Sequence, residues 1–143
     1  MYLVAIIDWY SRYVLSWGIS ITLESEFCVS ALEDAIEKYG TPEIFNTDQG
    51  AQFTSEDFTS TLLQHDIKIS MDGKGRALDN VFIERFWRSL KWEKIYLIVL
   101  TTVSEAKYAI SEYMNFYNSK KIHQSLDYST PEMVYLNKKK LLQ

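Results

Sequence analysis

The segment EIFNTDQG, residues 43–50, largely determines how this chain is expected to fold. Its first five residues, EIFNT, are predicted to form a short buried strand, and the polar Asp-Gln-Gly that follows ends it. A helical pattern precedes it, from Ser25 as the expected N-cap to Gly40 as the stop. A buried strand that directly follows a helix is one repeating unit of α/β domains.

The alternation is expected to continue toward the C-terminus. Thr54, with Asp57 three residues later, resembles a capping box that opens a helix to about His65. Residues 67–71 (IKISM) are predicted to form another strand. Further helices are predicted over residues 80–94, from residue 104 to about 117, and over a short segment whose first residue is Pro131.

The N-terminal side of the segment contains two more predicted strands. Residues 2–7 form a short apolar run, and residues 12–21 are β-branched and aromatic with loose alternation. The polar turn between them, residues 8–11, predicts an antiparallel hairpin. A hairpin followed by alternating strands and helices predicts an α/β layered domain with a mixed sheet.

Composition limits the possible function classes. The chain has 143 residues, 47% of them hydrophobic, which suits one domain with a real core. The net charge of −4 argues against a stand-alone nucleic-acid binder, although a catalytic domain whose DNA affinity is supplied elsewhere can carry this balance. The single cysteine, Cys28, is interpreted as a core residue. With no apolar run of membrane-spanning length and no signal-like segment, no membrane partner and a cytoplasmic location are expected.

Two acidic residues occupy positions suited to a site. Asp48 directly follows a predicted buried strand, where α/β sheets place their ligand crevice. Glu84 lies one turn inside the helix predicted over residues 80–94. On that helix two stripes are expected: an apolar one of Ile83, Phe86, Trp87 and Leu90, and a polar one of Asn80, Glu84, Arg88 and Lys91.

Two interpretations of Glu84 remain open at this point. Carboxylate oxygens are preferred ligands of Mg²⁺, so Glu84 and a second carboxylate could hold a cation for phosphoryl chemistry. Alternatively, Glu84 is a surface carboxylate paired with Arg88 four residues later, and spacing alone favours this pair. His65 and His123 have no ligand-like spacing, so no zinc role is expected for them.

The local motifs favour the metal interpretation. NTDQGAQFTS at residues 46–55 resembles the second-aspartate motif of the integrase-core transposases, and GKG at 73–75 followed by FIERFWRSLK at 82–91 is similar to their glutamate helix. Asp48 and Glu84 are separated by 35 residues, the spacing that gives the D,D(35)E family its name. YNS at 117–119, HQSL at 123–126 and Thr130-Pro131 resemble the C-terminal signature of insertion-sequence transposases.

This resemblance implies a ribonuclease-H-like fold and metal-dependent DNA strand cleavage and transfer. In that scheme Asp48 and Glu84 are catalytic ligands of Mg²⁺ or Mn²⁺, and Lys91 contacts DNA. The remaining DNA-facing residues would be Gln49, Asn80 and Arg88. The implied partners are insertion-sequence ends, target DNA, further copies of the chain and a full-length transposase. Residues 1–118 would form the catalytic core and residues 119–143 a basic C-terminal tail.

The family's site has three carboxylates, and the first belongs to a strand that would precede residues 2–7. Asp8 is the available substitute, but it is interpreted as a turn residue that hydrogen-bonds its own backbone. The chain is therefore expected to be N-terminally truncated, with its first strand missing. An inactive fragment that acts as a binding or assembly module is the alternative to an active transposase core. A general ribonuclease-H-type nuclease would also need the missing acid.

Overall fold

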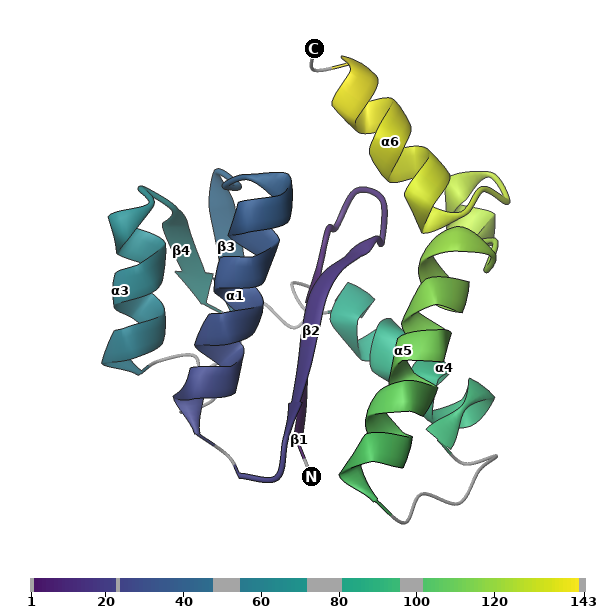
Figure 1. The fold of residues 1–143 in the computed structure, drawn as a ribbon. Helices are drawn as coiled ribbons and strands as arrows, with labels where there is room; N and C mark the ends of the chain where they lie inside the picture. The colour runs from purple at the N-terminus through teal and green to yellow at the C-terminus, as the bar shows by residue number, and fades with distance from the viewer. Residues whose placement is uncertain (1, 23, 48–54, 72–80, 96–101, 142–143) are drawn as a thin grey trace. The chain divides into compact units, whose positions relative to one another are not determined.

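The computed structural model describes residues 2–22, 24–47, 55–71, 81–95 and 102–141 (Figure 1). In chain order the elements are β1 (Tyr2–Ile7), β2 (Val14–Ser20), α1 (Ser25–Tyr39), β3 (Ile44–Thr47), α3 (Glu56–Gln64), β4 (Lys68–Met71), α4 (Val81–Glu93), α5 (Val103–Ser119), the short 3-10 helix η3 (Gln124–Leu126) and α6 (Pro131–Leu141). The chain divides into two compact units: residues 1–6 with 15–84, and residues 7–14 with 85–143. None of the described helices is long and apolar enough to cross a membrane.

The first unit contains most of the β1–β2 hairpin and a parallel strand pair covered by helices. β3 and β4 run parallel, with Ile44 opposite Lys68 and Thr47 opposite Met71. Helices α1 and α3 pack together, and Figure 1 shows them beside the β3–β4 pair. The buried core gathers from β1, α1 and α3 and from the residue before β4: Val4, Ile6, Cys28, Ala31, Leu32, Ala35, Phe58, Leu62 and Ile67. Partly buried side chains pack against it from β2 (Leu15), β3 (Phe45) and β4 (Ile69). Cys28 is only 1% exposed, which confirms its prediction as a core residue.

Strand pairing differs in one respect from the predicted mixed sheet. The four described strands form two hydrogen-bonded pairs, β1 with β2 and β3 with β4, and no ladder joins the pairs within the described residues. The hairpin and the parallel pair are nevertheless both present. Their side chains meet in a single core, so the pairs are held together by burial of apolar surface.

Two predicted helix caps are displaced by one residue. Ser25 is already helical, so the N-cap of α1 is Glu24, whose side chain makes no capping bond. In α3 the N-cap is Ser55 and not Thr54, which lies outside the described residues. Ser55 has an extended backbone, and its hydroxyl accepts a bond from the Phe58 N–H at 3.3 Å. A side chain can cap a helix only from the last non-helical residue, and this explains why Glu24 and Ser55 are the N-caps.

The second unit is built on α5. Its buried face presents Ala106, Ala109, Ile110, Tyr113, Met114 and Tyr117. From α4, Phe86 packs edge-to-face on Tyr117 with ring centroids 4.9 Å apart, and Leu90 is 2% exposed. Helix α5 begins at Val103, one residue before the expected start, because Thr102 caps it through the Glu105 N–H at 3.1 Å. Helix α6 begins at Pro131 as predicted, but its 11 residues make it longer than the short helix expected.

Candidate metal and DNA site

Helix α4 presents the predicted polar and apolar stripes. Glu84 lies in its first turn and is exposed, and Arg88 and Lys91 are exposed further along the same helix. Phe86 and Leu90 are buried, at 1% and 2% exposure. The stripe assignment is therefore confirmed for these residues, because burying one face of the helix turns the other toward solvent. Asp48, Gln49 and Asn80 lie outside the described residues.

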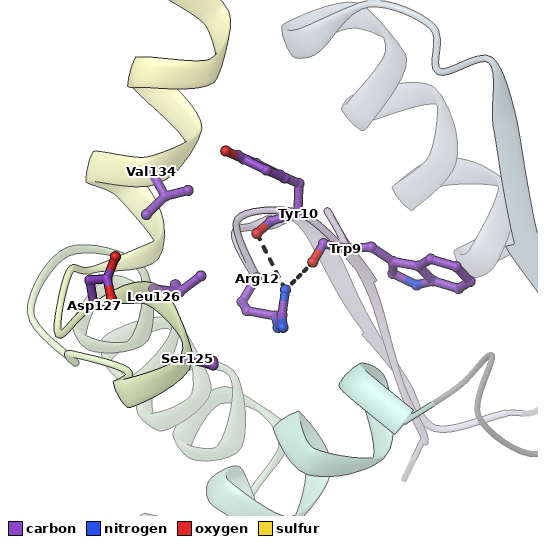
Figure 2. A pocket seen from close by; sticks show the side chains of 7 residues that line it. All are labelled: Trp9, Tyr10, Arg12, Ser125, Leu126, Asp127 and Val134. Carbon is purple, nitrogen blue, oxygen red and sulfur yellow. Dashed lines mark hydrogen bonds between the residues drawn. The ribbon is translucent and has the colours of Figure 1, made fainter.

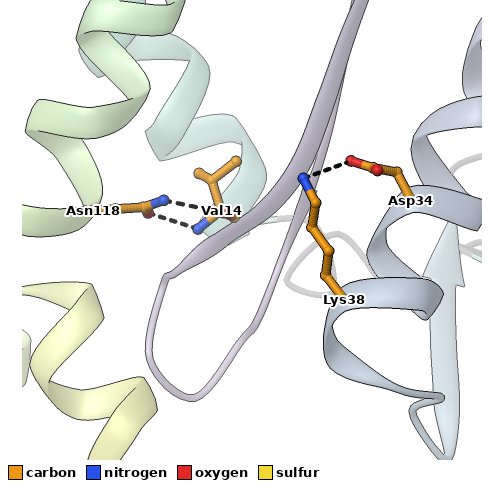
Figure 3. Close-up of polar contacts among 4 residues, drawn as sticks. All are labelled: Val14, Asp34, Lys38 and Asn118. Carbon is orange, nitrogen blue, oxygen red and sulfur yellow. Dashed lines mark hydrogen bonds and ion pairs between the residues drawn. The ribbon is translucent and has the colours of Figure 1, made fainter.

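The alternative role of Glu84 as the ion-pair partner of Arg88 is not found. Ion pairs between described residues join Lys38 to Asp34, Lys94 to Glu112 and Lys121 to Glu93, and none of these involves Glu84 or Arg88. The Lys38–Asp34 pair is an exposed i,i+4 contact at 3.2 Å (Figure 3), the arrangement that Glu84 and Arg88 do not adopt. The carboxylate of Glu84 is thus not neutralised by Arg88.

The end of β3 leads directly into Asp48. Thr47, the last residue of the strand, is 5% exposed, and its Oγ1 has no hydrogen-bond partner among the described residues. The neighbouring Asn46 donates from Nδ2 to Ser70 Oγ at 3.5 Å, while its Oδ1 is buried without a partner. Buried oxygens without a partner are uncommon and need an explanation, such as an ion or an ordered water. Within the described part of the chain, no group of three His, Cys, Asp or Glu side chains could hold a metal.

Asp8 forms the hairpin turn that the sequence predicts. Its Oδ2 accepts bonds from the Ser11 N–H at 3.0 Å and from the Ser11 hydroxyl at 2.7 Å. Ser11 is fully buried, and the N–H of Arg12 donates to the Asp8 carbonyl at 2.7 Å. These local bonds confirm that Asp8 bonds its own turn.

Sequence reasoning did not identify the role of Asn118. Its Oδ1 accepts from the Val14 N–H at 2.8 Å, and its Nδ2 donates to the Val14 carbonyl at 3.0 Å (Figure 3). The amide thus bonds both backbone groups of Val14, as a neighbouring strand would. Asn118 belongs to the predicted C-terminal signature, and it follows Tyr117 of the buried α5 face. That position was the only signal in the sequence.

The aromatic centre of the second unit shifts the pKa values of its ionisable groups. Burial raises the pKa of Tyr113, and its hydroxyl donates to Glu93 Oε2 at 2.9 Å, which raises the pKa further. Lys121 pairs with the same carboxylate. The ring of His123 lies 5.2 Å from that of Tyr117, and burial followed by the charge of Lys121 lowers the pKa of His123. This network is only partly buried, because the side chains of Lys121 and Glu93 remain 23% and 38% exposed.

Known proteins provide an independent comparison. Two family models described as integrase core domain match residues 1–77 and 65–131. A transposase for insertion sequence element IS904 from Lactococcus lactis is 36% identical over 135 residues, which cover 92% of this chain and 53% of that protein. The chain spans about half the length of the curated relatives it matches.

Solved structures show the same fold. The catalytic core domain of BIV integrase has a TM-score of 0.76 at 18% identity, covering 99% of this chain and 90% of its own. The HTLV-2 integrase catalytic core domain in complex with magnesium has a TM-score of 0.63 at 22% identity, covering 92% of this chain and 82% of its own. The predicted ribonuclease-H-like integrase core is therefore confirmed as the fold.

Proposed function

This chain belongs to the integrase core domain family, as an insertion-sequence transposase of the DDE type, and we propose that it catalyses metal-dependent DNA strand cleavage and transfer. Asp48 and Glu84 are the proposed metal ligands. The observation that carries this assignment is the exposed Glu84 carboxylate, which Arg88 does not neutralise, on a helix anchored by Phe86 and Leu90. A rigid helix holds such a carboxylate in a defined position for an ion.

The residues that precede Asp48 fit a hard cation. Mg²⁺ and Mn²⁺ prefer oxygen ligands and usually keep several waters. Asn46 and Thr47, whose buried oxygens lack partners among the described residues, lie two residues and one residue before Asp48, where they could bond waters of a hydrated ion. When bound, the ion would stabilise the charge that develops on a phosphoryl oxygen. The HTLV-2 integrase core, which shares the fold, has been solved with magnesium.

DNA is the proposed substrate, and it would bind the exposed face of α4 that carries Glu84. Arg88 and Lys91 are exposed on α4 beyond Glu84, and cations in this position can hold a phosphate of the strand being cut. Gln49 and Asn80 are proposed as additional DNA-facing groups beside the two ligands. The substrates would be insertion-sequence ends and target DNA, bound by several copies of the chain. The HTLV-2 core is known in trimeric and dimeric forms.

Metal binding is the most direct test, because both proposed ligands, Asp48 and Glu84, can be substituted one at a time. Binding of Mn²⁺ should be measured by electron paramagnetic resonance for the unmodified chain, Asp48→Asn and Glu84→Gln. Each substitution removes one anionic ligand, so affinity should fall at least about tenfold, equal to about 1.4 kcal/mol. Glu33→Gln, at an exposed position on α1, is the matched control and should bind as the unmodified chain does.

Two results would contradict the proposal. If Glu84→Gln bound Mn²⁺ as tightly as Glu33→Gln, then Glu84 would not be a ligand. If the unmodified chain bound no Mn²⁺, the inactive binding or assembly module would be the better assignment. Strand transfer on labelled insertion-sequence ends, with Mg²⁺ present, then tests activity itself.

A further inference from the structure

A cavity of about 620 Å³ lies entirely within the second unit (Figure 2). It is lined by Trp9, Tyr10, Arg12, Ser125, Leu126, Asp127 and Val134. Its volume falls in the range of sites that bind small organic groups. The lining residues are mixed: two aromatic rings, a guanidinium, a hydroxyl and a carboxylate lie beside two aliphatic groups. Figure 2 shows the Trp9 ring directed away from the other labelled side chains, so Tyr10 is the aromatic surface.

Two sequence motifs that the metal site does not use meet at this cavity. The first is the hairpin turn over residues 8–12, and the second is the HQSL segment over residues 123–126. The Asn118 bonds to Val14 tie the end of α5 to the residue where β2 begins, just after this turn. The two walls of the cavity are therefore held by bonds that are independent of any ligand.

The backbone around the cavity adopts conformations that L-residues seldom take. Arg12 has a φ of 66°, Asp127 of 52° and Tyr128 of 61°. The only other positive φ at a described non-glycine residue is that of Asp66, in the first unit. Each such residue costs on the order of 1 kcal/mol or more, and such residues cluster at ligand sites. Here they set the positions of Arg12 and Asp127 in the cavity wall.

The charges argue against a simple phosphate site. Arg12 Nη1 donates to the carbonyls of Trp9 and Tyr10, which orients the guanidinium plane. Partial burial lowers the pKa of Arg12, and the nearby Asp8 carboxylate opposes that shift. Asp127 contributes a carboxylate to the same wall, which would repel a phosphate. A guanidinium and a carboxylate in one wall, beside an aromatic ring, suit a flat, neutral group with hydrogen-bonding edges.

We propose that this cavity binds one unstacked base of single-stranded DNA. The Tyr10 ring, 61% exposed, offers the stacking surface, and the Arg12 guanidinium supports the base or its sugar. Ser125 and Asp127 face the edge of the base, where the carboxylate accepts a bond from an exocyclic amine. This inference rests on the proposed function, since a chain that handles cut DNA ends meets unpaired nucleotides.

The preference of the Asp127 carboxylate for an exocyclic amine would distinguish one base from another. Cytosine carries an N4 amine that can donate to Asp127, whereas thymine presents a carbonyl oxygen at the same place. An aromatic platform alone tolerates every base, because every base has a π-face. Tyr10 should therefore govern affinity, and Asp127 should govern the preference for cytosine over thymine.

The test measures fluorescence anisotropy of labelled dC10 and dT10 oligonucleotides with the full chain in EDTA. Because no metal is present, the proposed metal site cannot contribute, and Glu33→Gln, at an exposed position on α1, should bind both oligonucleotides as the unmodified chain does. We expect dC10 to bind about fivefold or more tightly than dT10. Tyr10→Ala should weaken dC10 binding about tenfold or more. Tyr108→Ala, at a ring 69% exposed on α5, is the matched control and should change nothing.

Asp127→Asn separates recognition from folding. Asparagine tolerates the left-handed backbone of position 127, so the turn should remain intact. This variant should bind dT10 as before and lose most of the preference for dC10. The salt dependence provides a second readout: because stacking dominates, log K against log[salt] should have a slope no steeper than about −1. The proposal is overturned if Tyr10→Ala matches Tyr108→Ala, if dC10 and dT10 bind equally, or if neither binds.

Discussion

Replacing Asn118 by alanine should destabilise the fold through a backbone residue distant in sequence. The amide makes two bonds to Val14, which is 4% exposed. At about 1 kcal/mol for each bond, the loss is about 2 kcal/mol. The substitution also leaves the N–H and carbonyl of Val14 without that partner, which adds a desolvation cost on the order of 1 kcal/mol. This cost lies at the low end of its range because Asn118 is only half-buried, so water can reach the two groups. The expected total is about 3 kcal/mol.

Urea unfolding followed by far-ultraviolet circular dichroism measures this loss. The midpoint for Asn118→Ala should fall by about 1 M or more with an unchanged slope. Asn118→Asp keeps an acceptor for the Val14 N–H but places a carboxylate against the Val14 carbonyl, so it should be destabilised to a similar degree. Asn115→Ala, at an exposed position on the same helix, should stay within about 0.5 kcal/mol of the parent. A loss for Asn118→Ala no larger than that control would refute the reasoning.

Three further outcomes are expected. Burial raises the pKa of Tyr113, so as pH rises the unfolded chain loses the Tyr113 proton before the folded chain does. The free energy of unfolding should therefore fall above about pH 10. In denaturant titrations, Tyr113→Phe should flatten this decline by up to about 1.4 kcal/mol per pH unit. Asp8→Asn should lower thermal stability by about 1 kcal/mol yet leave Mn²⁺ affinity unchanged, and a loss of affinity as large as that of Glu84→Gln would make Asp8 a ligand. Ser55→Ala should cost about 1 kcal/mol and Ser60→Ala much less, because only the Ser55 hydroxyl caps α3.

Element types and core faces could be predicted from the sequence because they depend on local periodicity. The buried stripe of α1 and the Phe86–Leu90 face of α4 repeat at helical spacing, and apolar runs mark the strands. The first residue of a helix was harder to predict, because several polar residues near a helix start can serve as the N-cap. Whether Glu24 or Ser25 is the N-cap of α1 depends on which of the two has the extended backbone, and the pattern of residue types does not specify this.

The candidate site was only partly accessible from the sequence. The exposed stripe of Glu84, Arg88 and Lys91 followed from helical geometry, and the spacing from Asp48 was visible directly. Whether Glu84 pairs with Arg88 could not be decided from spacing, because an i,i+4 pair on an exposed helix is worth only a few tenths of a kcal/mol. Side-chain packing in the folded chain decides whether an ion pair with so small a free energy forms.

The sequence by itself determined the family, the order of strands and helices, the buried helix faces and the turn role of Asp8. All of these depend on residues close together in the chain, where period, caps and short motifs carry the information. The sequence did not determine the burial of β3, which was predicted as a buried strand although Ile44 is 56% exposed. Only the tertiary structure decided that Asn118 bonds Val14, 104 residues away, and that the hairpin turn and the HQSL segment share a cavity. Those contacts join distant residues through individual hydrogen bonds and packing, which leave no periodic trace in the sequence.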